Sequence, residues 1–445
     1  MNQACFKTYD VRGKVPHELN PEIAAAIAAA YAEVLQPARV AVGYDVRLTS
    51  PELAAAVVEG LLSQGVDCYE LGMGGTEEVY FATFSGQLDG GIMVTASHNP
   101  SEYNGMKMVG RLGAPLTADQ LQQIRQQLGQ QRSRRRGNRL HREWRAQYVD
   151  WLAERFPPQR LARVKTVANA GNGSIGPLLR QVAERLELDV EVLLPEPDGT
   201  FPNGIPNPLL PEKRSLTSQG VLDHGASLGV AWDGDFDRCF FFDSQGRFLE
   251  SYYLVGLFAT HFLKRQTGAI CYDPRLTWNT IEVVEAAGGT PLLCPTGHVF
   301  FKQHLRSSGA LYGGEMSGHH YFQEFGCCDS GLLPWLLWLS LQAEQSQSLT
   351  ELIHERALRY PVSGEINRSV GDQGKVLAAI RQRYRDEALQ SWDLDGVSYD
   401  FERWRFNLRS SNTEPLIRLN VETRGDADLL REKTEEILTL VDESS

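Results

Sequence analysis

The sequence predicts an α/β protein in which three similar α/β domains precede a smaller C-terminal α+β domain. The chain has 445 residues, which is too long for a single hydrophobic core. Short apolar strand candidates alternate with helical stretches over most of this length, and such alternation is typical of sheets covered by helices. The last part instead ends with an alternating strand and a long helix. We therefore expect domains at residues 1–145, 146–250, 251–360 and 361–445.

Two capped helices and three strands predict the first domain. Asn20 with Pro21 and Ser50 with Pro51 each precede an alanine-rich stretch, so we expect an N-cap followed by proline in the first turn of each helix. Strands are expected at 39–45, 66–72 and 90–97. A Gln- and Arg-rich run at 126–145 has almost no apolar periodicity and is interpreted as an exposed linker, with an RNA-binding patch as the alternative.

The later domains follow from the same patterns. Strands are expected at 164–170, 189–195 and 227–233, with a helix at 177–186 between the first two. A third α/β unit spans 251–360. A half-buried strand at 416–423 and a closing helix at 426–441 predict the smaller α+β domain.

Composition excludes several classes of partner. The net charge of −12 argues against a general nucleic-acid binder, because phosphate backbones are held by clustered Lys and Arg. Seven cysteines without a CxxC pair fit a reducing cytosol, so a cytoplasmic location is expected. The most apolar run, 331–341, is too short to span a bilayer and is expected to be interrupted by Pro334. No targeting or membrane segment is expected.

A small hydroxyl ends the apolar strand in the segment GGIMVTASHNP. Ser97 stands where the strand must end, because Pro100 cannot donate a hydrogen bond to a sheet. His98 and Lys107 could orient or neutralise an anion on this hydroxyl. A polar turn is the alternative, but the company of these two side chains favours a functional serine.

Three aspartates alternate in the segment WDGDFDRC. In an extended chain Asp233, Asp235 and Asp237 would share one face and repel one another. A divalent cation removes that repulsion, and Mg²⁺ is expected where a phosphate supplies a further oxygen. Arg238 stands in place of the turn glycine of an EF-hand, which excludes that motif. A solvated acidic turn is the alternative, disfavoured by the apolar flanks.

Two further polar loops suggest sugar and phosphate recognition. In YGGEMSGHHYF, Glu315 and Ser317 offer the acceptor and donor that sugar hydroxyls need. His319 and His320 make metal binding conceivable there, but no HExxH spacing supports it. In RSSNTEP, a guanidinium with hydroxyls and amides could form a phosphate cradle or an ordinary turn, and the residues are Arg409, Ser410, Ser411, Asn412 and Thr413.

A glycine-rich loop supports a rival hypothesis. The segment GNGSIG, residues 171–176, follows a strand and precedes a helix, with Asp189 and Glu191 about twenty residues further on. This spacing is that of a dinucleotide-binding loop and would indicate a nicotinamide-dependent dehydrogenase. The interpretation leaves the serine loop and the three aspartates unexplained.

The four polar loops, taken together and in this order, resemble the signatures of the α-D-phosphohexomutase superfamily. Their sequences are TASHNP, DGDFDR, GEMSGHH and RSSNTEP. Four further stretches resemble sequences of the bacterial phosphomannomutase branch of this superfamily, which serves GDP-mannose synthesis. They are FKTYDVRGK, NPLLPE, TGHVFFK and WRFNLRSSNTEP. The resemblance covers the chain end to end. It implies three α/β domains with mixed sheets plus a smaller C-terminal α+β domain around a central cleft, in a monomer or homodimer.

The resemblance also implies a role for individual residues. Ser97 would be the phosphoserine, and Mg²⁺ would be bound by its phosphate with Asp233, Asp235 and Asp237. The transferring phosphoryl group would be surrounded by Tyr9, Arg12, His98, Lys107 and Arg238. Sugar hydroxyls would be held by Glu315 and Ser317, the pocket lined by Arg275, His298, Lys302 and His319, and the non-reacting phosphate bound by Arg409, Ser411, Asn412 and Thr413. Arg275 and Gly318 depart from the lysine and alanine common in relatives.

The implied reaction interconverts mannose 6-phosphate and mannose 1-phosphate. Phosphorylated Ser97 would donate to the free sugar hydroxyl, and a hexose 1,6-bisphosphate, which also serves as activator, would turn over and return its other phosphate. Lys107 or a histidine could be the general base. A dual phosphomannomutase/phosphoglucomutase remains open, because mannose and glucose differ only at C2. A non-catalytic sugar-phosphate sensor is disfavoured by the intact serine and aspartates.

Overall fold

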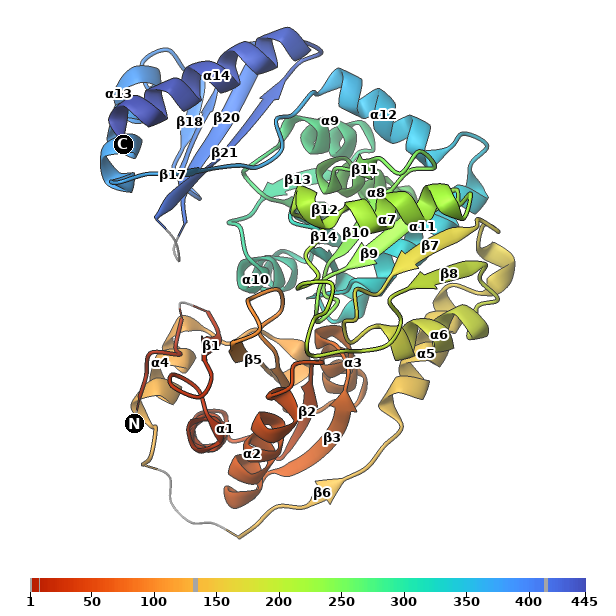
Figure 1. The fold of residues 1–445 in the computed structure, drawn as a ribbon, viewed down its shortest axis with the longest axis vertical. Helices are drawn as coiled ribbons and strands as arrows, with labels where there is room; N and C mark the ends of the chain where they lie inside the picture. Colours follow the sequence, from red (N-terminus) through yellow and green to blue (C-terminus); the bar gives the residue numbers. More distant parts are fainter. Residues whose placement is uncertain (1, 8, 131–134, 412–414) are drawn as a thin grey trace. The chain divides into compact units, whose positions relative to one another are not determined.

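A computed structural model describes residues 2–7, 9–130, 135–411 and 415–445. The chain folds into two compact units, which are described separately. Unit 1 comprises Met1–Phe248 and Ser317–Ser346, and unit 2 comprises Leu249–Met316 and Gln347–Ser445. Figure 1 shows the elements of both units in chain order.

The first sheet of unit 1 has six strands in the order β1-β5-β4-β2-β3-β6. Strands β2, β3, β4 and β6 are parallel, whereas β5 is antiparallel to both β4 and β1. Helices α1, α2 and α4 share an apolar core with these strands. The elements are β1 Val11–Lys14, α1 Pro21–Leu35, β2 Arg39–Tyr44, α2 Ser50–Ser63, β3 Asp67–Met73, α3 Thr76–Ser85, β4 Gly90–Val94, β5 Tyr103–Gly110, α4 Ala118–Gln126 and β6 Arg139–Leu140, with a 3-10 turn at Arg111–Gly113.

The two predicted helix caps differ in outcome. The Asn20 side chain accepts a hydrogen bond from Ile23 N at 3.0 Å, as a cap should, and Pro21 begins α1. The prediction for Ser50 was wrong, because α2 begins at Ser50 itself and Thr49 precedes it. The Ser50 hydroxyl instead donates to Asp45 Oδ1 at 2.6 Å. This hydrogen bond replaces the helix cap that the hydroxyl was expected to form.

The run at 126–145 is only partly a linker. Within its described residues, β6 pairs in parallel with β3, and α5 begins at Trp144. Arg136 and Arg139 form ion pairs with Glu59, and Arg139 also pairs with Glu70. Acidic side chains of the same domain therefore meet two of the arginines that suggested an RNA-binding patch. Residues 131–134 lie outside the described part of the chain.

The second sheet of unit 1 has the order β11-β10-β9-β7-β8. Strands β7, β8 and β9 are parallel and β10 is antiparallel to β9, so this sheet is mixed as well. The elements are α5 Trp144–Arg155, β7 Thr166–Asn169, α6 Gly176–Arg185, β8 Val190–Leu193, α7 Ser215–Asp223, β9 Leu228–Trp232, β10 Cys239–Phe242 and β11 Phe248–Leu249, with 3-10 turns at Pro158–Arg160 and Pro211–Lys213.

Helix α11 covers β10 in unit 1. It runs without a break from Leu332 to Glu344, so the expected interruption at Pro334 was wrong; the proline lies in the first turn, where its missing N–H costs no helical hydrogen bond. Trp338 stacks on Phe241 with ring centroids 5.2 Å apart. Before the helix come the antiparallel strands β15 His320–Phe322 and β16 Cys328–Asp329, separated by a turn at Gln323–Phe325. None of the described helices is both long and apolar enough to cross a membrane.

Unit 2 begins with the parallel strands of the third domain. Strand β12 pairs in parallel with β13 and β14. The elements are α8 Ser251–Arg265, β12 Ala269–Tyr272, α9 Trp278–Ala286, β13 Thr290–Leu293, α10 His298–Ser308, β14 Tyr312–Gly314 and α12 Leu349–Arg359.

The C-terminal part of unit 2 is an antiparallel sheet in the order β17-β21-β20-β19-β18. Helices α13 and α14 cover one face of it, as Figure 1 shows. The predicted fold class of three α/β domains followed by a smaller α+β domain is therefore confirmed. The elements are β17 Ile366–Ser369, α13 Gln373–Tyr384, β18 Gln390–Trp392, β19 Val397–Asp400, β20 Trp404–Ser410, β21 Leu416–Thr423 and α14 Ala427–Ser444.

Candidate active site

The serine loop of unit 1 is held in an uncommon backbone conformation. Ser97 follows β4 and has a φ of +50°, in the left-handed region that residues other than glycine rarely adopt. Its N–H donates to Thr95 Oγ1 at 2.8 Å, and Thr95 in turn donates to Asp45 Oδ2 at 2.7 Å. The Ser97 side chain is buried, with 4% of the residue exposed. The surrounding contacts thus fix a conformation that is locally strained.

Arg47 anchors this loop from the segment between β2 and α2. Its guanidinium donates to the backbone oxygens of Ser97 at 2.9 Å and Asn99 at 2.6 Å. It also donates to the oxygens of Pro100 at 2.8 Å and Tyr103 at 3.0 Å. The side chain is fully buried and keeps an ion pair with Asp45 at 3.3 Å. One guanidinium therefore donates to four carbonyl oxygens of the serine loop and the residues after it.

The three predicted aspartates gather directly after β9. Asp233, Asp235 and Asp237 are buried, and one oxygen from each lies within 4.8 Å of the others. Ser97 Oγ donates to Asp233 Oδ2 at 3.0 Å, so the structure brings the serine loop and the acidic loop together. Gly234 permits this approach, because a Cβ there would come within 2.8 Å of the Ser97 carbonyl oxygen.

The aspartate cluster fits a bound divalent cation. Oδ1 of Asp235 and Oδ1 of Asp237 are buried without a hydrogen-bond partner among the described residues. Burying unpaired carboxylate oxygens is costly, and a hard cation with oxygen ligands would remove the cost. Thr76 supports the cluster from the start of α3: its hydroxyl donates to Asp235 Oδ2 at 2.6 Å, and its N–H donates to the Asp235 carbonyl oxygen at 3.1 Å.

Lys107 supplies positive charge to the same aspartates. Its Nζ lies 2.6 Å from Asp235 Oδ2 and 2.5 Å from Asp237 Oδ2. Burial alone would lower the pKa of Lys107, but the two carboxylates raise it above its usual range. Burial and the charge of Asp235 raise the pKa of Asp237. A cation bound by these carboxylates would take over the neutralising role that the lysine has here.

Two arginines and His98 lie beside Ser97. Arg238 donates through Nε and Nη2 to Asp233 Oδ2 at 2.9 and 2.7 Å, and its Nη2 lies 2.7 Å from His98 Nδ1. Because a guanidinium only donates, this nitrogen of His98 accepts and the imidazole is neutral. Although the residue as a whole is exposed, loss of solvent around the ring and the charges of Arg238 and Arg12 lower the pKa of His98 well below its usual range. Arg12 donates to Asn99 Oδ1 at 2.5 Å and Asp10 Oδ2 at 2.8 Å.

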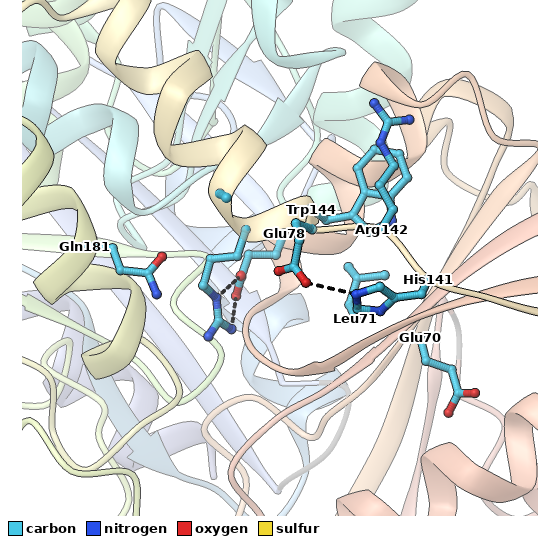
Figure 2. Close-up of a pocket in the computed structure, with 10 residues that line it drawn as sticks. Glu70, Leu71, Glu78, His141, Arg142, Trp144 and Gln181 are labelled. Atoms are coloured by element: carbon cyan, nitrogen blue, oxygen red, sulfur yellow. Dashed lines mark hydrogen bonds and ion pairs between the residues drawn. The ribbon is translucent and has the colours of Figure 1, made fainter.

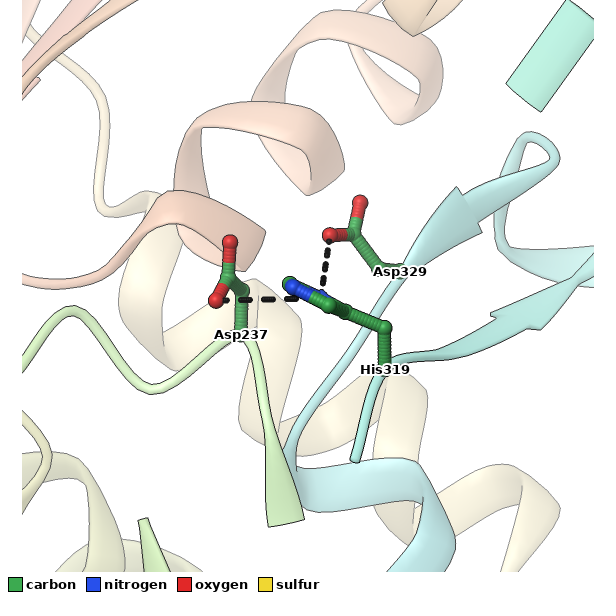
Figure 3. A group of neighbouring side chains, drawn as sticks. All are labelled: Asp237, His319 and Asp329. Carbon is green, nitrogen blue, oxygen red and sulfur yellow. Dashed lines mark ion pairs between the residues drawn. The ribbon is translucent and has the colours of Figure 1, made fainter. Parts of the chain in front are cut away.

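His319 lies between two carboxylates, as Figure 3 shows. Its Nδ1 is 3.2 Å from Asp329 Oδ2 and 3.9 Å from Asp237 Oδ1. An isolated antiparallel β-bridge between the backbones of Arg238 and His319 places the histidine beside the acidic loop. His320, by contrast, is fully buried in β15, and burial lowers its pKa to about 3, which is typical of a structural histidine.

The remaining predicted residues of unit 1 lie near these loops in the chain. Tyr9 precedes β1 and is 41% exposed, and Ser317 is partly buried. Gly318, where the family resemblance led us to expect alanine, has a φ of +90°, and a Cβ there would lie 2.9 Å from the Phe240 ring. Both the backbone and the packing therefore favour glycine over alanine at this position.

Unit 2 brings Arg275 and Glu315 together. Arg275 is buried and donates to Asp273 through Nε at 3.1 Å and Nη2 at 2.8 Å, and the same Nη2 lies 3.4 Å from Glu315 Oε1. Glu315 Oε1 also accepts from Gly297 N at 3.0 Å, directly before α10. His298 and Lys302 follow in that helix, with Lys302 Nζ 3.3 Å from His298 Nδ1. Four of the predicted substrate residues are thus placed by α10 and the loops after β12 and β14.

The predicted phosphate cradle lies at the end of β20. A hollow of about 420 Å³ is lined by Leu377, Asp395, Gly396, Arg409, Ser410, Ser411 and Arg418. Arg409 Nη2 donates to Glu365 Oε2 at 3.0 Å, and Arg409 Nη1 lies 3.8 Å from Asp395 Oδ2. The predicted residues Asn412 and Thr413 lie outside the described residues.

A second hollow in unit 1, of about 320 Å³, is lined by none of the predicted residues. Figure 2 shows Glu78 and His141 among its lining side chains. Both already have partners that also line the hollow, since Glu78 pairs with Arg145 at 2.7 Å and His141 with Glu143 at 2.9 Å. The glycine-rich loop at 171–176, which suggested a dinucleotide-binding loop, has a packing explanation. A Cβ on Gly176 would lie 1.8 Å from the Pro195 carbonyl oxygen, and Ser174 Oγ accepts from Val46 N at 3.0 Å.

Comparison with protein families covers all four domains. Residues 3–135, 146–246 and 250–360 match phosphoglucomutase/phosphomannomutase α/β/α domains I, II and III, and residues 365–440 match the C-terminal domain. The chain belongs to the phosphoglucomutase/phosphomannomutase family.

Whole-chain relatives within this family have related names. The chain is 48% identical to a phosphomannomutase of Salmonella montevideo over 452 residues, covering 99% of each chain. It is 49% identical to a protein named phosphohexose mutases of Xanthomonas campestris, covering 99% of this chain and 100% of that one. Among solved structures, a phosphoglucomutase/phosphomannomutase family protein of Burkholderia thailandensis superposes with a TM-score of 0.89 at 30% identity, covering 100% and 99% of the two chains.

Sequence reasoning missed four residues that contact predicted site residues: Arg47, Thr76, Asp329 and Glu365. Each is a single polar residue without a repeating pattern around it. Asp329 ends β16 and Arg47 lies three residues after β2, and this position near a strand end was the one usable signal for them. Thr76 lies in the first turn of a helix, where threonine is common, so its sequence position gave no sign of a functional role.

Proposed function

We propose that this protein is a phosphomannomutase that interconverts mannose 6-phosphate and mannose 1-phosphate through a phosphoserine at Ser97. The observation that carries the proposal is the hydrogen bond between Ser97 Oγ and Asp233 within a buried cluster of three aspartates. The 48% identity with the Salmonella montevideo phosphomannomutase supports mannose as the sugar. The protein would act in the cytoplasm, as a monomer or homodimer.

The residues around Ser97 suit phosphoryl transfer. Mg²⁺, held by Asp233, Asp235, Asp237 and the phosphate of Ser97, would neutralise charge on the transferring group. Arg238 and Arg12 carry guanidinium donors that suit phosphoryl oxygens. Arg47 fixes the backbone of the serine loop, so the reacting oxygen needs little reorganisation.

The attacking sugar hydroxyl must lose a proton during transfer. We assign this proton to His319, because Asp329 Oδ2 lies 3.2 Å from its Nδ1 and can hold the ring while Nε2 accepts. Lys107 donates to two carboxylates and is better suited to balancing their charge. In unit 2, Glu315 would accept from sugar hydroxyls, and Arg409 with Ser411 would bind the phosphate that is not reacting.

The test measures mutase turnover on mannose 1-phosphate and glucose 1-phosphate with Mg²⁺ and a trace of hexose 1,6-bisphosphate. Wild-type protein should convert mannose 1-phosphate, EDTA should abolish turnover, and Ser97→Ala should lower kcat by about 10³-fold or more, because no other hydroxyl can replace the nucleophile. Ser101→Ala, at an exposed serine of the same loop, is the matched control and should behave as wild type.

Intact-mass analysis gives a second readout. The mass of one phosphoryl group should be present on wild type and on Ser101→Ala after incubation with hexose 1,6-bisphosphate, and absent from Ser97→Ala. Faster conversion of glucose 1-phosphate would reassign the sugar. Turnover that depends on neither metal nor Ser97 would overturn the phosphoserine mechanism.

A further inference from the structure

Glu365 is a carboxylate shared by three arginines of unit 2. Its Oε2 accepts from Arg409 Nη2 at 3.0 Å and lies 3.8 Å from Arg275 Nη1. Its Oε1 lies 3.7 Å from Arg418 Nη1. The side chain precedes β17 and is 11% exposed, so these charges meet in a largely dry environment where they interact strongly.

The three arginines have different surroundings. Arg409 and Arg418 line the hollow of about 420 Å³, whereas Arg275 contacts Asp273 and Glu315. Nε of Arg409 is buried without a hydrogen-bond partner in the described part of the chain. Among the described residues Arg409 therefore has one unpartnered donor, while Glu365 already occupies another nitrogen of the same guanidinium.

Charge balance explains why a carboxylate is needed here. Burial by itself would raise the pKa of Glu365, but the guanidiniums of Arg409, Arg275 and Arg418 lower it, so the residue is ionised. Asp395 also lines the hollow and lies 3.8 Å from Arg409, whereas Glu365 contacts both Arg409 and Arg418 and so reduces the repulsion between them. Removing one partner of a buried charge group leaves the other charges uncompensated.

We propose that Glu365 is a resident counter-ion that competes with substrate phosphate for Arg409 and Arg418 and so assists release of phosphate from the cradle. The inference rests on the proposed function, in which the bisphosphate must free one phosphate from the cradle and present the other. When phosphate leaves, Glu365 restores the ion pairs that the arginines lose. The carboxylate weakens phosphate binding and in return lowers the cost of exchanging the two ends of the intermediate.

Calorimetric titration with inorganic phosphate tests the competition without any need for turnover. Glu365→Gln keeps the shape of the side chain and removes its charge, so it should bind phosphate about tenfold more tightly than wild type. Glu365→Asp keeps the charge on a shorter stem and should fall between the two. Glu435→Gln, at an exposed position of α14, makes the same charge change away from the arginines and should bind as wild type does.

The opposite ordering would overturn the proposal. If Glu365→Gln binds phosphate equally or less tightly, Glu365 orders the arginines and does not compete with phosphate. Thermal unfolding of each variant accompanies the titration. If Glu365→Gln fails to fold, Glu365→Asp decides the question, because competition predicts tighter binding and an ordering role predicts weaker binding.

Mutase kinetics test the assisted release. In Glu365→Gln, KM for mannose 1-phosphate and kcat should both fall, each by about tenfold. Tighter binding of phosphate in the cradle would slow the step in which the bisphosphate exchanges its two phosphates. An unchanged kcat would contradict the proposal. A wild-type protein without mutase turnover would overturn the proposed function alone, since the phosphate titration would still report on the competition at the arginines.

Discussion

At the scale of single residues, the site depends on buried side chains that hold its loops in place. Arg47 donates to the carbonyl oxygens of Ser97, Asn99, Pro100 and Tyr103 and is fully buried. These contacts offset the strain of the positive φ at Ser97. A planar guanidinium can reach several acceptors at once, whereas an ammonium group on a flexible stem cannot reproduce that geometry.

We therefore predict that Arg47→Lys lowers kcat by about 10- to 100-fold with little change in KM, because the serine loop loses its fixed geometry. The free energy of unfolding should fall by about 2–4 kcal/mol, since carbonyls of the loop lose their donors. Steady-state kinetics and urea unfolding measure both effects. Arg39→Lys, at an exposed arginine at the start of β2, should change neither quantity. Wild-type kcat in Arg47→Lys would contradict the anchoring role.

Thr76 supports a second prediction at this scale. Its hydroxyl donates to Asp235 Oδ2 at 2.6 Å and orients that carboxylate within the cluster. Thr76→Val should weaken Mn²⁺ binding about 10- to 100-fold, as expected for groups that orient a metal ligand. Thr76→Ser, which keeps the hydroxyl, should bind Mn²⁺ nearly as wild type does. Electron paramagnetic resonance of free Mn²⁺ measures the affinity, and equal weakening in both variants would indicate lost packing instead.

At the scale of elements, one buried carboxylate joins α3 to the start of α11. Glu77 Oε2 accepts from Ser330 Oγ at 2.7 Å and Gly331 N at 2.6 Å, and Oε1 lies 2.9 Å from Tyr148 Oη. Burial raises the pKa of Glu77 to about 8. Tyr148 Oη donates to Oε1, and the hydrogen bonds to this carboxylate offset only part of the effect of burial.

The raised pKa predicts a pH-dependent stability. Unfolding returns Glu77 to a pKa of about 4.5, so between about pH 4.5 and pH 8 the folded protein holds one more proton than the unfolded chain. The stabilisation is complete below pH 4.5 and is lost as the pH rises to 8, by up to about 1.4 kcal/mol per pH unit. Urea unfolding of wild type and Glu77→Gln over this range measures it. Parallel pH profiles for the two proteins would disprove the prediction.

At the scale of the whole molecule, the proposed metal ligands all lie in unit 1. Asp233, Asp235, Asp237 and Ser97 are therefore brought together by the folding of that unit, from segments on two different sheets. A ligand that binds only the folded cluster stabilises the unit that forms it. Because the chain has two compact units, we compare apparent melting midpoints and do not assume a single two-state transition.

We predict that Mg²⁺ raises the apparent melting midpoint of unit 1. At a concentration about 100 times its Kd, the gain is about 2.7 kcal/mol. Asp235→Asn should lose the shift although its metal-free form need not be less stable, since one of three neighbouring like charges is removed. Asp386→Asn, at an exposed position of unit 2, should keep the full shift. Differential scanning calorimetry with and without EDTA makes the comparison, and an equal shift in Asp235→Asn would place the cation elsewhere.

The sequence by itself determined the fold class, the alternation of strands and helices, and the loops that carry Ser97 and the three aspartates. These features depend on local patterns: apolar periodicity, turn residues and polar residues at strand ends. Local patterns were weaker guides to the ends of elements, as Ser50 and Pro334 illustrate. A hydroxyl can cap its own helix or bond to another strand, and only packing selects between the two.

Only the tertiary structure decided which residues support those loops. Thr76 and Asp235 are 159 residues apart, and Arg47 lies 50 residues before Ser97. Glu365 contacts Arg409, which lies 44 residues further along the chain, and also Arg275, which lies far before it in the sequence. Each of these side chains has an ordinary sequence neighbourhood, and its role arises because packed sheets bring a single charge to a particular unsatisfied partner. Local sequence carries the pattern of a strand or a turn, but the pairing of distant polar groups is settled only when the core closes around them.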